Sequence, residues 1–234
     1  MIAAEGARIS HVARHGDLAA PVSHLGRWKV RDVVAHLGGV HRWAARIVAA
    51  SSMDGPGFQK SKLDGTELLD WFDDGVTALV DVLRATGPDE PCPNFNPGSP
   101  ELVRFWLRRQ LHETTIHRWD VEAAAGAPAP IPVDVATDGI DEYLDVFVRT
   151  RGKQTLSAPL RLVATEERRS WTLTPAAKPG RLVVDPADET DVRATIEAPA
   201  EQLLLYLWGR LPFEEAGLSV SGDAGVARSL RAVG

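Results

Sequence analysis

The chain has 234 residues, 44% hydrophobic and 25% charged, a composition typical of globular proteins and a length that favours two domains. Its net charge of -6 argues against nonspecific binding to nucleic acid or to an anionic membrane. No apolar run approaches the roughly 20 residues that span a bilayer, and charged residues interrupt the first segment, where a signal peptide needs an apolar core. Cys92 is the single cysteine, so no intrachain disulfide can form, and we expect a cytoplasmic protein.

Helical periodicity dominates the first half of the chain. In chain order we expect a weak helix at 3–15 and strong helices at 29–50 and 64–86. A proline- and asparagine-rich loop at 87–100 precedes a third strong helix, which ends about Gly126. A connector at 127–132 and a helix at 133–150 follow. Ser99 and Pro100 are suited to be the N-cap and the first-turn proline of the third strong helix. These segments predict a bundle of four or five helices.

The second half changes to the period of β-strands. Apolar residues alternate with polar ones in three segments, 159–165, 170–175 and 192–198, as in half-buried strands of a mostly antiparallel sheet. Helices are expected at about 199–211 and 223–233. The sequence therefore predicts a helical domain over residues 1–152 and a small α+β domain over residues 153–234.

The helix predicted at 102–124 carries a candidate pair of metal ligands. Glu113 and His117 are four residues apart and share its apolar face, where a carboxylate is costly unless it is paired or bound to a metal. His112 and His117 are five apart, about 140° around the helix, so HETTIH is not a working H-E-x-x-H motif. The alternative is that Glu113 meets an arginine and His117 bonds a backbone carbonyl, since buried ion pairs also occur without metals.

A metal site needs a third ligand, and the helix at 29–50 offers two histidines. Periodicity places His41 inside the apolar stripe of this helix and His36 at its margin, so geometry slightly favours His41. A lone histidine on such a face is more often a core residue than a ligand. The residues alone leave the choice open.

Two motifs resemble the mycothiol-dependent maleylpyruvate isomerase family. Its tryptophan followed by D-x-x-x-H-L is matched by Trp28 and DVVAHL (32–37), and its H-E-x-x-x-H-R-W-D is matched by HETTIHRWD (112–120). The resemblance extends over nearly the whole chain and implies an N-terminal DinB-like four-helix bundle followed by a sterol-carrier-like α+β domain. It also implies that His36, Glu113 and His117 bind a divalent metal, which we expect to be zinc, and that His41 is a packing residue.

Three protein ligands leave a coordination position open, as in catalytic sites. The resemblance implies that a low-molecular-weight thiol, mycothiol, adds there to a cis double bond, allows rotation and leaves the trans isomer. Relatives in the wider superfamily are thought to transfer thiols instead. The same triad could support metal-dependent hydrolysis through bound water. A non-catalytic binding module with a structural metal is a further alternative, whereas a metal-responsive regulator is disfavoured because no basic patch is present.

Residues outside the triad complete the predicted site. Arg210, in a W-G-R that recurs in the family, is expected to bind a carboxylate of substrate or thiol cofactor, for which a planar guanidinium is suited; the alternative is that it only complements a helix C-terminus. Asp120 could orient a metal ligand or pair with an arginine, and we favour the pairing. Cys92 is interpreted as an incidental thiol in a flexible loop. The expected partners are a small-molecule substrate and the thiol, with neither nucleic acid nor membrane, in a monomer or homodimer.

Overall fold

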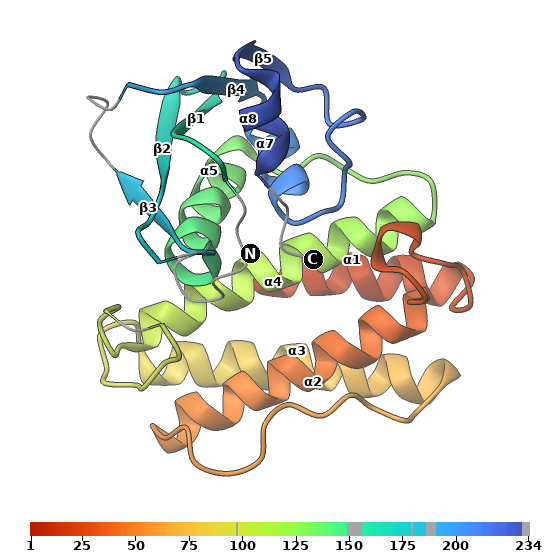
Figure 1. Cartoon of the computed structure of the whole chain (residues 1–234). Helices are drawn as coiled ribbons and strands as arrows, with labels where there is room; N and C mark the ends of the chain where they lie inside the picture. Colours follow the sequence, from red (N-terminus) through yellow and green to blue (C-terminus); the bar gives the residue numbers. More distant parts are fainter. Residues whose placement is uncertain (97, 149–155, 179, 186–190, 231–234) are drawn as a thin grey trace. The chain divides into compact units, whose positions relative to one another are not determined.

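The helical periodicity of the first half and the alternation of the second give two different units in the computed structural model of the chain (Figure 1). The structure describes residues 1–234 except 97, 149–155, 179, 186–190 and 231–234. Contacts divide the chain into Met1–Ala129 and Pro130–Gly234. The boundary predicted at residue 152 lies outside the described residues. No helix among the described residues is long and apolar enough to cross a membrane.

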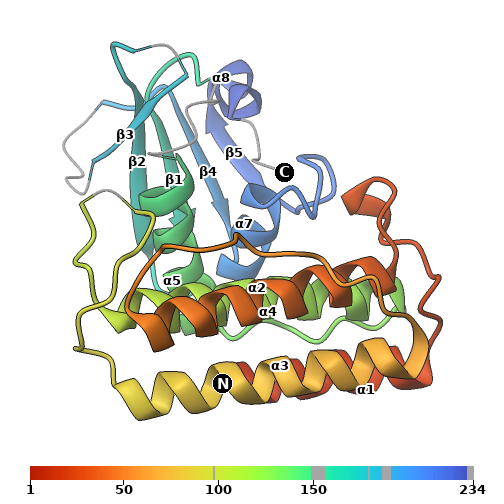
Figure 2. The ribbon, with the colours of Figure 1, turned by 90° about the horizontal axis from the view of Figure 1, so that it is seen from below.

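Four helices form the first unit. They are α1 (Ile2–His15), α2 (Val30–Ala50), α3 (Gly65–Thr86) and α4 (Val103–Ala124), with a short 3₁₀ turn, η1 (Ser23–Leu25), before α2. The strong contacts join α1 with α3, α3 with α2, α2 with α4, and α4 with α1. Figure 2 shows the resulting two layers, α1 with α3 and α2 with α4. The sequence predicts all four helices, and α2 and α3 begin within one residue of the predicted positions.

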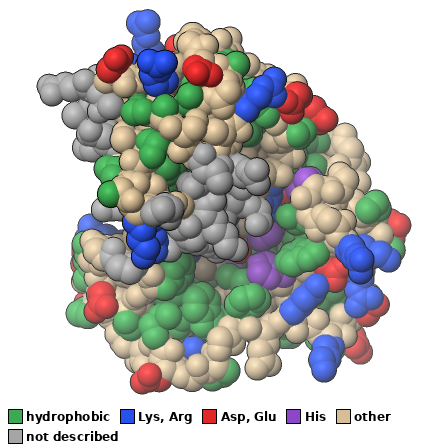
Figure 3. Space-filling model, in the orientation of Figure 1, with side chains coloured by type: hydrophobic (Ala, Val, Ile, Leu, Met, Phe, Trp, Pro, Cys, Tyr) green, Lys and Arg blue, Asp and Glu red, His purple; other side chains and the backbone are tan. Residues whose placement is uncertain are grey.

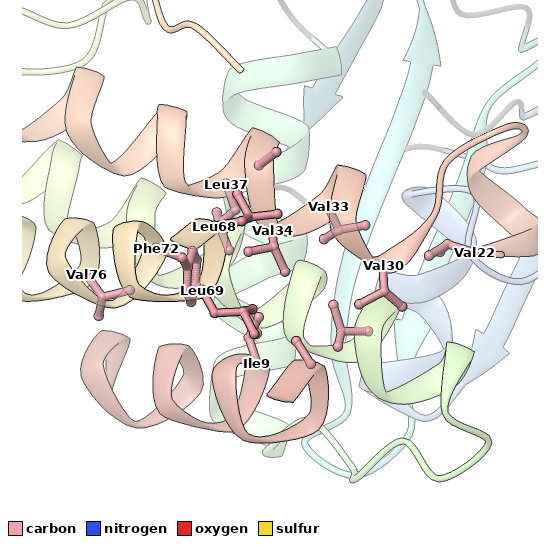
Figure 4. Packing of buried hydrophobic residues seen from close by; sticks show 13 residues of the cluster. Ile9, Val22, Val30, Val33, Val34, Leu37, Leu68, Leu69, Phe72 and Val76 are labelled. Atoms are coloured by element: carbon pink, nitrogen blue, oxygen red, sulfur yellow. The ribbon is translucent and has the colours of Figure 1, made fainter. Parts of the chain in front are cut away.

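The apolar stripes of the helices meet in one core. Ile9 of α1, Leu37 of α2, Leu68 and Phe72 of α3, and Val121 of α4 are fully buried in this cluster (Figure 4). Burying a side chain of this size contributes roughly 1.5–3 kcal/mol relative to leaving it in water. This packing fixes the rotation of α2 and α4 about their axes and thereby the direction of their polar residues.

The start of α4 differs from the sequence prediction. Ser99 and Pro100 are not its N-cap and first turn, because α4 begins at Val103 after Leu102, which provides no side-chain cap. The backbone N–H of Val103 instead donates to the carbonyl of Glu90 at 3.0 Å, and that of Arg104 to the carbonyl of Pro88 at 2.9 Å. The preceding loop thus satisfies the free N–H groups of the first turn, a non-local solution to the requirement that side-chain caps usually meet.

The second unit begins with a helix rather than a strand. The predicted helix at 133–150 is α5 (Val133–Glu142) followed by a π-helical segment, η2 (Tyr143–Val148), and its last two residues lie outside the described part of the chain. α5 packs against α7 (Ala200–Leu207), so it belongs with the sheet domain and not with the bundle. The structure therefore groups this helix with the second unit, whereas the sequence analysis counts it in the first domain.

The sheet has five strands in the order β3-β2-β1-β4-β5. The strands are β1 (Leu160–Ala164), β2 (Arg169–Pro175), β3 (Leu182–Asp185), β4 (Ala194–Ala198) and β5 (Ser219–Gly222). Among the strands that the structure describes, only the β1–β4 pair is parallel, so the mostly antiparallel sheet predicted from the sequence is confirmed. Buried and half-buried residues alternate along β1, as the sequence predicts, and α7 contacts β1 and β4. The last predicted helix, at 223–233, is α8 (Ala224–Ser229), which ends before Leu230; residues 231–233 of the prediction lie outside the described part of the chain.

Candidate metal centre

One face of α4 and one position of α2 bring three metal-binding side chains together. His36, Glu113 and His117 each offer one ligand atom, and these three atoms lie within 4.8 Å of one another. Glu113 Oε1 is 3.4 Å from His36 Nε2 and 3.5 Å from His117 Nε2. The spacing of four between Glu113 and His117 places both on the side of α4 that meets α2. The donors thus converge from two neighbouring helices.

The buried carboxylate of Asp120 is hydrogen-bonded to Nδ1 of His117, the ring nitrogen that is not the candidate ligand atom. Asp120 is fully buried; its Oδ2 lies 2.8 Å from His117 Nδ1, and its Oδ1 lies 2.7 Å from His24 Nε2. A carboxylate can only accept hydrogen bonds, so His117 Nδ1 and His24 Nε2 each carry a proton. Because Asp120 keeps the proton on Nδ1, loss of the second proton from Nε2 would leave its lone pair directed toward Glu113 and His36, which is the form of His117 that can bind a metal. Carboxylates fix metal-binding histidines in this way in many proteins.

The charges of the cluster reinforce one another. Burial by itself raises the pKa of Glu113, but the nearby charge of Arg109 and the hydrogen bonds to His117 and His36 hold it well below its usual range. Arg109 Nη2 donates to Glu113 Oε2 at 2.7 Å, so Oε1 is the oxygen turned to the histidines. Burial would lower the pKa of His117, yet its hydrogen bonds to Asp120 and Glu113 raise it above the usual value. A cation bound there replaces the proton that these carboxylates attract.

The donor set is suited to a divalent metal of borderline softness. Two imidazole nitrogens and one carboxylate oxygen are the ligands of many catalytic zinc sites, where a fourth position is left for water or substrate. His36 and Glu113 are each about a fifth exposed, so the cluster is reachable from outside. The rings of Trp28 and Phe58 flank His36, each with its centroid 5.1 Å from the imidazole. Figure 3 shows histidine side chains at the surface beside hydrophobic ones.

The structure separates the candidate histidines of the sequence. His41, which periodicity favours over His36, is fully buried and is not part of the cluster; its Nε2 lies 3.0 Å from Thr114 Oγ1 and its ring packs against Phe72. Burial lowers the pKa of His41 to about 3, so it is a neutral core residue. His112 is buried and is not part of the cluster, in agreement with its position around α4.

Two other expectations change. We favour a salt bridge between Asp120 and an arginine from the sequence, whereas the contacts of Asp120 with His117 and His24 support the orienting role. His24 was missed altogether, because it lies in the η1 turn and no helical spacing relates it to α4. Cys92 is buried, and burial raises the pKa of its thiol, so it does not lie on a flexible exposed loop.

Arg210 lies just after α7 in the second unit. Gly209, at a φ of 68°, and the backbone N–H of Arg210, which donates to the carbonyl of Leu205 at 2.8 Å, form a Schellman-type ending. The guanidinium is buried, and its Nη1 donates to the carbonyl of Trp208 at 2.8 Å. Arg210 therefore contacts a carbonyl group at the helix end.

Comparison with known proteins gives the family. Two solved structures of the mycothiol-dependent maleylpyruvate isomerase, one with a histidine replaced by alanine, superpose with a TM-score of 0.67 over 95% of this chain and 92% of theirs, at 15 and 16% identity. At that identity they show the shared fold. No curated protein sequence matches significantly. The family model of the mycothiol maleylpyruvate isomerase N-terminal domain matches residues 2–122, and that of the MDMPI C-terminal domain matches residues 134–229. The chain therefore belongs to the mycothiol maleylpyruvate isomerase family.

Proposed function

We propose that this protein is a divalent-metal-dependent isomerase that uses a low-molecular-weight thiol. The observation that supports the proposal is the convergence of His36, Glu113 and His117 on one point from α2 and α4. Family membership and the solved mycothiol-dependent maleylpyruvate isomerases of the same fold favour mycothiol as the thiol and cis–trans isomerisation as the reaction.

The side chains of the cluster have distinct roles in this proposal. His36 and His117 supply neutral nitrogen donors, and Glu113 supplies the one negative charge that partly neutralises a divalent cation. Asp120 keeps His117 in the tautomer that can bind a metal. A bound metal lowers the pKa of a thiol from about 8.5, so that the nucleophilic thiolate is available at neutral pH. Trp28 and Phe58 exclude water beside His36 and thereby strengthen the charge interactions of the centre.

The thiol comes from outside the chain in this proposal. Cys92 is the single cysteine, it is buried, and it is not among the residues of the cluster.

Arg210 is our proposed contact for a carboxylate of the substrate or the thiol. Arg210→Lys keeps the charge but loses the planar, two-pronged donor, so binding weakens while the fold is retained. Unchanged turnover in this variant would leave Arg210 with its helix-end role alone.

Metal content and thiol binding test the proposal directly. Purified protein is expected to carry about one equivalent of zinc or a similar ion. His117→Ala and Glu113→Ala should abolish metal binding, whereas the matched variant His112→Ala, on the same helix, should retain it. Protein that stays metal-free after growth in undepleted medium contradicts the proposal.

Cobalt substitution separates the thiol chemistry from other reactions. Adding mycothiol to the cobalt protein should produce a sulfur-to-cobalt charge-transfer band, and the Cys92→Ser variant should give the same band. A spectrum indifferent to thiols, together with thiol-independent hydrolysis, would assign the centre to a hydrolase. Product analysis with mycothiol and a cis-configured substrate then distinguishes isomerisation from thiol transfer, since only transfer leaves the thiol in the product.

A further inference from the structure

A pocket lies within the first unit, along α2. It has a volume of about 470 Å³ and is bounded by one face of α2, by the segment 56–63 and by Trp71 of α3. The segment 56–63 packs closely on the helix, because a Cβ on Gly39 would lie 2.3 Å from the carbonyl oxygen of Gln59. Glycine at this helix position costs about 1 kcal/mol relative to alanine, and in return lets the segment form a wall of the pocket.

The lining of the pocket is positively charged. Arg42, Arg46 and Lys60 line it, and none of its described lining residues is acidic. Two of the three cations are already bonded. Lys60 pairs with Asp32 at 2.7 Å, and Arg46 donates to the carbonyl groups of Asp54 and Pro56. Arg46 therefore fixes the segment that forms the wall of the pocket. Arg42 is the cation for which neither an ion pair nor a hydrogen bond has yet been described.

The guanidinium of Arg42 is fixed but not neutralised. It lies over the ring of Trp71, 4.0 Å from the centroid, which holds its plane. Its Nη1 is buried and has no hydrogen-bond partner among the described residues. Gly75 of α3 makes room for this nitrogen, since a Cβ there would lie 2.1 Å from Nη1. Burial lowers the pKa of Arg42, and the charge of Asp74 offsets that effect in part. This nitrogen faces α3 and not the pocket. Arg42 also lines the pocket and forms no ion pair with a described carboxylate, so an anion in the pocket would meet a positive charge that is not neutralised.

The rest of the lining is flat and apolar. Trp43 and Trp71 contribute aromatic rings, and Phe58 and Leu63 are exposed apolar residues that also line the pocket. Phe58 offers an exposed ring, and Arg42 is stacked on the ring of Trp71. This combination is suited to a planar ligand that carries a negative charge at one end. We propose that this pocket binds an aromatic or conjugated carboxylate, with Arg42 as the receptor for the carboxylate and Trp43, Phe58 and Trp71 around the planar body.

The position of Phe58 connects this pocket to the metal centre. Phe58 lines the pocket and also packs edge-on against His36 at 5.1 Å. A ligand in the pocket is thus separated from the proposed metal ligand His36 by one aromatic ring. The proposal itself rests on Arg42 and its surroundings and does not depend on the metal or on the thiol.

Calorimetric titration of the full-length protein with benzoate tests the proposal, with benzamide as the neutral ligand of the same shape. Benzoate should bind and benzamide should not, because the amide lacks the charge that Arg42 requires. Arg42→Gln should weaken benzoate binding about tenfold or more, as expected for a lost charge-assisted hydrogen bond. Arg42→Lys keeps the charge without the planar donor and should weaken it by a smaller factor. The matched control is Arg31→Gln, a loss of the same charge on α2 at an exposed ion pair with Asp64, and it should bind benzoate like the wild type.

Two further variants separate this site from its alternatives. Gly75→Ala retains Arg42 but displaces its guanidinium, so benzoate binding should fall although the net charge is unchanged. His117→Ala removes a proposed metal ligand and should bind benzoate normally, so that a failure of the metal proposal leaves this result intact. The proposal is overturned if benzoate does not bind, if benzamide binds equally well, or if Arg42→Gln and Arg31→Gln bind benzoate with the same affinity.

Discussion

Replacing Asp120 by asparagine tests whether the buried carboxylate holds the metal centre together. Asp120 accepts from His117 Nδ1 at 2.8 Å and from His24 Nε2 at 2.7 Å, and it is fully buried. An asparagine has one acceptor oxygen and one donor NH₂ group, so it can accept from only one of the two ring N–H groups. The NH₂ group faces the other N–H, and one of the histidines must turn or change its tautomer.

The expected loss is large because the substitution removes an acceptor and places a donor next to a ring N–H group. Loss of a carboxylate behind a metal-binding histidine typically costs 10–100-fold in metal affinity, which is about 1.4–2.8 kcal/mol. His24→Ala removes the contact of Asp120 with His24 and leaves His117 bonded, so its effect on affinity should be smaller than that of Asp120→Asn. The order of affinities expected is wild type, then His24→Ala, then Asp120→Asn, and last His117→Ala.

Competition with a chromophoric zinc chelator measures these affinities. Asp81→Asn, the same substitution at an exposed position of α3, is the control and should bind zinc like the wild type. Circular dichroism of the metal-free variants establishes that each is folded. If folded Asp120→Asn binds zinc as tightly as Asp81→Asn, Asp120 does not orient His117 and this account of the centre is wrong.

Two further predictions concern stability. The pKa of His41 is about 3 in the folded protein and near 6.5 in the unfolded chain, so between these pH values only the unfolded chain binds a proton at this residue. The free energy of unfolding should therefore fall as the pH decreases from 6.5 to 3, by up to about 1.4 kcal/mol per pH unit from His41. Urea unfolding at a series of pH values should show a shallower pH dependence for His41→Gln, and an unchanged slope would contradict the burial argument. Glu122 accepts from Arg8 at 2.7 Å and from Arg118 at 2.9 Å, so Glu122→Gln replaces a charged acceptor by a neutral one, while Arg118 keeps its ion pair with Glu5 at 2.7 Å. Losing the charged hydrogen bonds should cost about 1–3 kcal/mol, and a midpoint of urea unfolding equal to that of the wild type would exclude the role assigned to Glu122.

The sequence by itself determined the helices whose apolar residues recur regularly. The ranges 29–50 and 64–86 are nearly those of α2 and α3, because the stripe that faces the core is a local pattern of each segment. The strands β3 and β5 were not predicted. All four residues of β5 are exposed, so no buried face imposes an alternation on it. The start of α4 also escaped prediction, because carbonyl groups of residues 88 and 90 take the place of a side-chain cap.

The sequence also determined part of the candidate site. Glu113 and His117 share one face of α4 through their spacing alone, and the same argument separates His112 from them. Family motifs, rather than periodicity, named His36. Periodicity favoured His41 because it lies deeper in the apolar stripe, and for that reason the fold buries it as a neutral core residue.

Only the tertiary structure decided which donors meet and what supports them. His36, the proposed metal ligand, lies at the margin of a helix contact, where it is partly exposed and faces Glu113 on the next helix. The partners of Asp120 depend on a turn 96 residues earlier in the chain, and the surroundings of Arg42 depend on Gly75 and Trp71 of another helix. Sequence spacing fixes directions within one helix, whereas contacts between elements depend on how the whole core packs, which no local pattern contains.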